Sequence, residues 1–222
     1  MLCARVSVIL TMGLPGVPEQ WTDLANVAAG HKVDVRAAVL RAEAPIRTLI
    51  ARFLGVHTDE RAWRRGGEGE RAVAKVLARL GPAWHILHSI QVSESGTDVD
   101  HLVIGPGGVF SINTKNHLGK KVWVAGGTFM VNGQRQTYVA ASRSEAKKAS
   151  RLLTTAYGSP VSVIGVIAIL ADSLVVKEQP RDAYVIGRRR LADWLRAQPR
   201  RLDESESQAI FDIARRSTTW IP

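Results

Sequence analysis

The 222-residue sequence contains one cysteine, Cys3, and few aromatic residues, which make up 6% of the chain. A single cysteine cannot form an internal disulfide or a cysteine-rich zinc site, so a reducing cytoplasm is the expected compartment. No stretch reaches about 18 unbroken apolar residues, which argues against a membrane span. The apolar run from Val6 to Leu14 is interrupted by polar residues and precedes no clear cleavage site, so export is not expected.

Several catalytic motifs are also missing. The glycine-rich stretch 105–108 has no Gly-Lys-Ser/Thr after it and precedes a predicted strand, so it is a turn and not a phosphate-binding loop. No Gly-x-Ser-x-Gly motif or plausible cysteine nucleophile occurs, which argues against esterases and thiol enzymes. His85 and His88 have a metal-ligand spacing for a helix, but on a predicted strand they point to opposite faces.

Basic residues are in excess. Thirty Lys and Arg against twenty Asp and Glu give a net charge of +10, which favours an anionic partner, nucleic acid before an acidic membrane. The basic residues predicted to contact DNA lie on a helix near residue 147 and in a dense cluster near residue 189: Arg143, Lys147, Lys148, Arg188, Arg189 and Arg190. The alternative is that they are ordinary solvated surface.

Apolar spacing divides the chain into an N-terminal extension, residues 1–58, and a larger unit, residues 59–222. Within the extension, residues 33–54 have helical spacing broken at Pro45. This predicts an N-terminal helical appendage. A peripheral attachment to acidic membranes through this appendage is one alternative function.

The larger unit alternates helices and strands. Helices are predicted at 68–80, 142–157, 191–196 and 204–215, with a polar separator before residue 68. Strands are predicted at 84–92, in a hairpin over 98–116, and at 121–125, 128–131, 134–139, 161–170 and 183–186. This order predicts an α/β (α+β) fold with a central mixed β-sheet flanked by helices.

The hairpin DVDHLVIGPGGVFSINTKN, residues 98–116, carries the polar residues of most interest. With the turn centred on Pro106-Gly107, the numbers of facing residues sum to 213. Asp100 then faces Asn113 and Asp98 faces Lys115, and these four share one face of the hairpin. Glu70 lies on the inward face of the preceding helix, where it either complements the helix dipole or adds an acid to this patch.

Such a patch suits metal-dependent phosphodiester hydrolysis. Carboxylates hold Mg²⁺ through oxygen ligands, the metal activates a water, and a nearby lysine orients that water or stabilises the oxyanion. The alternative is that the acids, the amide and the lysine are cross-strand polar pairs on a solvated face. Spacing alone does not separate the two.

The runs GGEGERAVAKVLARL, DVDHLVIGPGGVFSINTKN and VWVAGGTFMVNGQRQ resemble the NERD (nuclease-related domain) family over residues 60 to 175. This resemblance implies a restriction-endonuclease-like core of the PD-(D/E)xK superfamily, DNA as partner, and Mg²⁺ or Mn²⁺ as cofactor. It implies that Glu70 matches the first-helix glutamate, Asp100 the metal-binding aspartate and Lys115 the lysine of the E-x-K motif.

The sequence departs from that pattern at Asn113, where glutamate is expected. An asparagine offers a carbonyl oxygen to a metal but no charge, and hard-cation affinity depends on ligand charge. The catalytic set is therefore Glu70, Asp100, Asn113 and Lys115, of which Glu70, Asp100 and Asn113 are the metal ligands. Either Asp98 or Glu70 supplies the missing charge and the protein is an altered nuclease, or it is a catalytically inactive nucleic-acid-binding or scaffold module.

Overall fold

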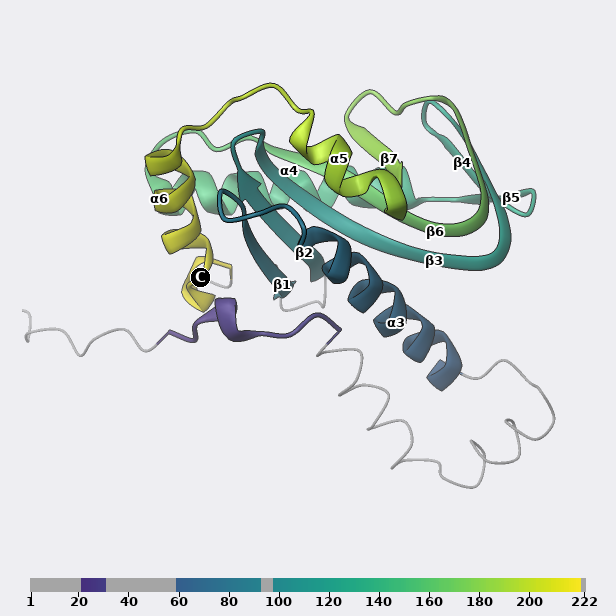
Figure 1. The fold of residues 1–222 in the computed structure, drawn as a ribbon, viewed down its shortest axis with the longest axis horizontal. Helices are drawn as coiled ribbons and strands as arrows, with labels where there is room; N and C mark the ends of the chain where they lie inside the picture. Colours follow the sequence, from purple (N-terminus) through teal and green to yellow (C-terminus); the bar gives the residue numbers. More distant parts are fainter. Residues whose placement is uncertain (1–20, 31–58, 93–97, 221–222) are drawn as a thin grey trace, which may run out of the picture.

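The computed structural model describes residues 21–30, 59–92 and 98–220 (Figure 1). The helices predicted for residues 33–54 lie outside these ranges, and the division of the chain at residue 58 stays a prediction. No helix within the described ranges is long and apolar enough to cross a membrane.

A seven-stranded mixed sheet forms the centre of the fold. Five strands follow one another as antiparallel neighbours: β1 (His85–Gln91), β2 (Asp98–Gly105), β3 (Gly108–Ala125), β4 (Thr128–Val131) and β5 (Gln134–Gln136). On the other edge of β3, β6 (Val163–Glu178) pairs parallel to β3, and β7 (Ala183–Gly187) pairs parallel to β6. The predicted mixed sheet flanked by helices is confirmed, as a restriction-endonuclease-like fold requires.

Helices cover both faces of this sheet (Figure 1). The α-helices are α3 (Asp59–Leu77), α4 (Tyr138–Tyr157), α5 (Leu191–Arg196) and α6 (Glu204–Ala214), and the short 3-10 helices are η1 (Leu24–Asn26), η2 (Arg188–Arg190) and η3 (Ser217–Thr219). On one face, Val73 and Leu77 of α3 and Leu191 of α5 pack against Phe110 of β3. On the other face α4 and α6 cover the sheet, with Leu153 and Ile210 in one buried cluster. The first halves of β3 and β6 are therefore largely buried, whereas residues 118–121 of β3 and most of β6 beyond residue 171 are exposed.

The register of the β2–β3 hairpin is confirmed only in part. Five pairs, from His101 with Ile112 to Gly105 with Gly108, have numbers that sum to 213. The predicted ladder pairs Asp100–Asn113 and Asp98–Lys115 are wrong, because the ladder ends at the His101 pair. Beyond this point β2 stays paired with β1 while β3 continues with β6, so the two strands separate.

Several elements are longer than predicted. β3 runs without a break through residues 117–120, where the sequence predicted a gap between two strands. β6 continues beyond residue 170 to Glu178. α3 begins at Asp59 and contains the glycines that were expected to form a separator. Packing is one reason for the continuous helix. A Cβ at Gly69 would lie 3.0 Å from Asn116 Cβ and 3.2 Å from Thr114 Cγ2, so glycine at this position lets the helix lie close to β3.

The segment 21–30 packs on the C-terminal part of the chain. Asp23 forms an ion pair with Arg215, and Leu24 N donates to Arg215 O at 2.8 Å. Ser217 N donates to Thr22 O at 3.1 Å. From there the segment runs toward α3, where Gly30 is buried (Figure 1). A stretch far from α3 in sequence thus reaches the helix that carries Glu70.

Candidate active site

The predicted acids approach one another where β2 and β3 separate. Glu70, on α3, is 8% exposed, and its charge interacts with those of Asp100 and Asp98 on β2. The N–H of Thr114 donates to Asp100 Oδ2 at 2.6 Å, in place of a ladder bond between the strands. This hydrogen bond holds the Asp100 carboxylate at the point where β2 and β3 separate. The region around Asp100, Glu70 and Lys115 is called the acidic opening below.

Both carboxyl groups hold their protons more strongly than usual. Burial raises the pKa of Asp100 to about 6, although the Thr114 N–H and Lys115 oppose the shift. Burial, and next the charge of Asp100, raise the pKa of Glu70 to about 8, while the N–H of Gly30 and Arg71 act in the opposite direction. Buried carboxylates that repel one another shift in this way, and such shifts concentrate at functional sites.

Asn113 contacts a residue that the sequence did not single out. Its side-chain amide donates to both carboxylate oxygens of Glu145 on α4, at 3.0 and 3.2 Å. Asn113 is 9% exposed, and its Oδ1 atom has no hydrogen-bond partner among the described residues. A buried carbonyl oxygen without a partner is rare, because it loses its hydrogen bonds to water on folding.

Glu145 is an acid of the same site. Burial raises its pKa, the Asn113 amide and Lys115 lower it, and Asp100 and Asp98 raise it. A signal for this residue does exist in the sequence, because Glu145 is the only acid in the twenty residues of α4. It lies beside the buried residues of that helix, among them Ser142, Ala146 and Ala149.

Lys115 lies beside the first turn of α4. Its Nζ atom is 5.0 Å from the centroid of the Tyr138 ring, and the same ring stacks on His117 at 5.6 Å. Its charge interacts with the carboxylates of Asp100 and Glu145. The positively charged side chain of Lys115 is thus present at the acidic opening, and a positive charge there would suit a phosphate group.

The oxygen donors of this site suit a hard divalent cation. Within the described residues, no three His, Cys, Asp or Glu side chains are grouped closely enough to hold a metal. Mg²⁺, however, is usually bound by one or two carboxylates, with waters and substrate phosphates completing the shell. The unpartnered Asn113 Oδ1 and the mutually repelling carboxyl groups fit such an ion.

The histidines of β1 and β2 make contacts of their own. His85 stacks on Phe211 with ring centroids 4.5 Å apart, on a different face from His88. The Nδ1 atoms of His88 and His101 are 2.8 Å apart, so one of the two carries the shared proton. Burial, with a smaller effect from His88, lowers the pKa of His101 to about 3. His101 therefore stays neutral and contacts Thr114 Oγ1 at 3.3 Å.

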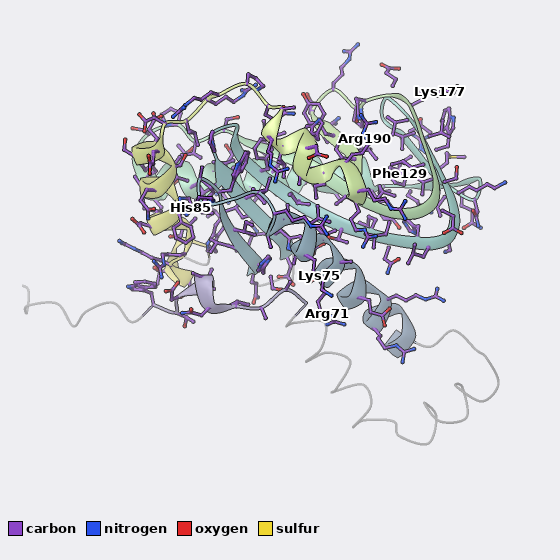
Figure 2. All side chains as sticks on the ribbon, in the orientation of Figure 1. Arg71, Lys75, His85, Phe129, Lys177 and Arg190 are labelled. Atoms are coloured by element: carbon purple, nitrogen blue, oxygen red, sulfur yellow. The ribbon has the colours of Figure 1, made fainter. Side chains whose placement is uncertain are left out.

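The predicted DNA-contacting residues form two groups. On α4, Arg143 and Lys147 are exposed, and Arg143 pairs with Asp182 at 3.2 Å, while Lys148 is half-buried. The three arginines of η2, residues 188–190, border a hollow of about 1330 Å³ that Lys177 also lines. Figure 2 labels Arg190 and Lys177. Glu70, Asp100, Asn113 and Lys115 do not line this hollow, so it is separate from the acidic opening.

Comparison with known protein families supports a nuclease-related domain in this chain. Residues 65–170 match the family model described as nuclease-related domain. An uncharacterized protein of Bacillus anthracis is 39% identical over 66 residues, which cover 28% of this chain and 30% of that protein. The chain thus matches less than a third of that relative's length. No solved structure matches the chain.

Proposed function

Because residues 65–170 match the family model of the nuclease-related domain, we propose that the protein binds DNA and hydrolyses its phosphodiester bonds with Mg²⁺ or Mn²⁺. The observation that supports this proposal is the acidic opening between β2 and β3, where Asp100 and Glu70 interact beside Lys115. The expected compartment is the cytoplasm.

Each residue has a role in this proposal. Asp100 and Asn113 would hold the cation, and Glu70 would support the site. A bound cation would activate water and offset charge on the phosphate. Lys115 would position the water as its oxygen bonds to phosphorus, the bond to the leaving oxygen breaks, and the proton released by the water is balanced by protonation of that leaving oxygen.

The basic residues of α4 and η2 would hold the DNA backbone. Lysine and arginine contacts to phosphates give binding that depends on salt and little on base sequence. The neutral Asn113 favours a second candidate, a binding module of the same fold without cleavage, because the expected acid is absent from β3.

The test is a cleavage assay on single- and double-stranded DNA with Mn²⁺. The Asp100→Asn variant keeps an acceptor for the Thr114 N–H but loses the charge, so cleavage should fall by about 100-fold or more, as expected for a lost metal ligand. The matched control is Asp172→Asn, because Asp172 also accepts a backbone N–H, from Gly119 at 3.1 Å, on an exposed part of the chain. Cleavage unchanged in Asp100→Asn would refute the site. If wild type cleaves no DNA but still binds DNA in a salt-dependent way, the second candidate, the binding module, is favoured.

A further inference from the structure

The acid missing from position 113 of β3 has a counterpart on α4. The amide of Asn113 faces the carboxylate of Glu145, with both carboxylate oxygens within hydrogen-bond distance. The two residues are 32 positions apart in the sequence. The negative charge expected on β3 is therefore present beside β3, carried by a helix.

The packing of α4 explains how Glu145 reaches the strand. A Cβ at Gly165 of β6 would lie 2.8 Å from Ser142 Oγ and 3.0 Å from Ser142 O, so the absent side chain at Gly165 lets α4 lie against the sheet. Ser142 and Glu145 are three residues apart and thus neighbours on one face of the helix. Close packing at Ser142 consequently brings Glu145 to Asn113.

The surroundings of Glu145 belong to the same site as those of Asp100. Its charge interacts with Lys115 on β3 and with Asp100 and Asp98 on β2. Beside it, the Oδ1 atom of Asn113, in a side chain 91% buried, has no hydrogen-bond partner among the described residues. This buried oxygen is therefore an acceptor, beside a carboxylate, that a bound cation would satisfy.

We infer that Glu145 supplies the carboxylate that Asn113 lacks, and that Glu145 and Asp100 together provide the negative charge for the divalent cation, with Asn113 Oδ1 as a neutral ligand. This inference rests on the proposed function. It replaces Asp98 and Glu70 as the sources of the missing charge considered from sequence alone. The site is then complete in charge although its E-x-K motif is altered.

The experiment measures Mn²⁺ binding to the full chain by isothermal titration calorimetry, with DNA cleavage and thermal unfolding as parallel readouts. Glu145→Gln keeps the size of the side chain and removes its charge, so Mn²⁺ affinity should fall by about tenfold or more. The double variant Asn113→Asp with Glu145→Gln exchanges acid and amide without changing either side-chain length. It should restore affinity to within about threefold of wild type, since the charge returns to the site from the strand side. Glu178→Gln, at an exposed glutamate of β6, is the control.

The outcomes separate this inference from the proposed function. If wild type and Glu145→Gln bind Mn²⁺ equally well, the role of Glu145 is overturned, but the proposed function is not. A folded double variant that binds no better than Glu145→Gln also overturns that role, because the acid would then serve only to anchor α4. Wild type that binds no Mn²⁺ overturns both. Loss in Glu145→Gln with recovery in the double variant supports the inference, even if no DNA substrate is cleaved.

Discussion

Replacing Glu70 with glutamine should make the protein more stable at alkaline pH in the absence of divalent cations. Glu70 is 8% exposed, and burial together with the charge of Asp100 raises its pKa from 4.5 to about 8. Between these two pH values the folded protein holds a proton on Glu70 that the unfolded chain has released. The free energy of unfolding therefore falls as pH rises through this window, and below pH 4.5 the group contributes no such loss.

The size of the effect follows from the same two values. Each pH unit between them corresponds to about 1.4 kcal/mol, so the full window corresponds to an effect of the order of 5 kcal/mol. Glu70→Gln removes the titrating group while keeping its shape, so the difference in unfolding free energy between variant and wild type should increase steadily from pH 5 to pH 8. Asp100 titrates in both proteins and largely cancels from this difference.

Urea denaturation at pH 5, 6.5 and 8, followed by tryptophan fluorescence, measures this difference, since Trp220 is fully buried. Glu68→Gln is the matched control, because Glu68 lies on the same helix with its side chain 57% exposed. Under the proposed function, Mg²⁺ should stabilise wild type at pH 8 more than Glu70→Gln. If the difference in unfolding free energy between Glu70→Gln and wild type is the same at pH 5 and pH 8, Glu70 is not held protonated by its surroundings.

Packing and charge provide the remaining tests. Gly69→Ala should lower the unfolding free energy by about 1 to 3 kcal/mol, because the added Cβ would lie very close to β3. Gly66→Ala, where nothing lies within 4 Å of the added Cβ, should raise the unfolding free energy by about 0.5 to 1 kcal/mol. Equal effects of the two variants in urea denaturation would contradict the packing of α3. Gly165→Ala should push α4 outward at Ser142, lowering the unfolding free energy by about 1 to 3 kcal/mol and weakening Mn²⁺ binding, and unchanged calorimetric affinity would argue against the link between this packing and the site. Replacing the three arginines 188–190 with glutamine should reduce the slope of log binding constant against log salt concentration by roughly 0.7 to 0.9 for each phosphate that these arginines neutralise, and an unchanged slope would place the DNA elsewhere.

Local patterns predicted the hairpin well and its open end poorly. Alternation and the Pro106-Gly107 turn are local, so the sum of 213 holds for the five pairs nearest the turn. The separation of β2 from β3 depends on their outer partners, β1 and β6, and β6 lies some fifty residues further along the chain. The prediction therefore failed where non-local pairing begins, which is also where Asp100 lies.

Two further differences have the same origin. The glycines before residue 70 suggest a break, but contacts with Thr114 and Asn116 on β3 favour a continuous helix there. Glu145 has no short-range neighbour in sequence that marks it as part of the acidic site. Its contact with Asn113 arises only once α4 is placed against the sheet, although a lone acid beside the buried residues of α4 was a signal of its own.

The contact between Asn113 and Glu145 bears on how proteins of this kind are sorted into active and inactive members. A survey that reads one column of aligned residues at position 113 would record a missing acid and discard the chain. A cation responds to all the carboxylates around its site, whichever element carries them. Here β2 carries Asp100 and α4 carries Glu145, whose charges interact. If Glu145 has the role inferred above, a count made from the motif alone would misjudge the charge of this site.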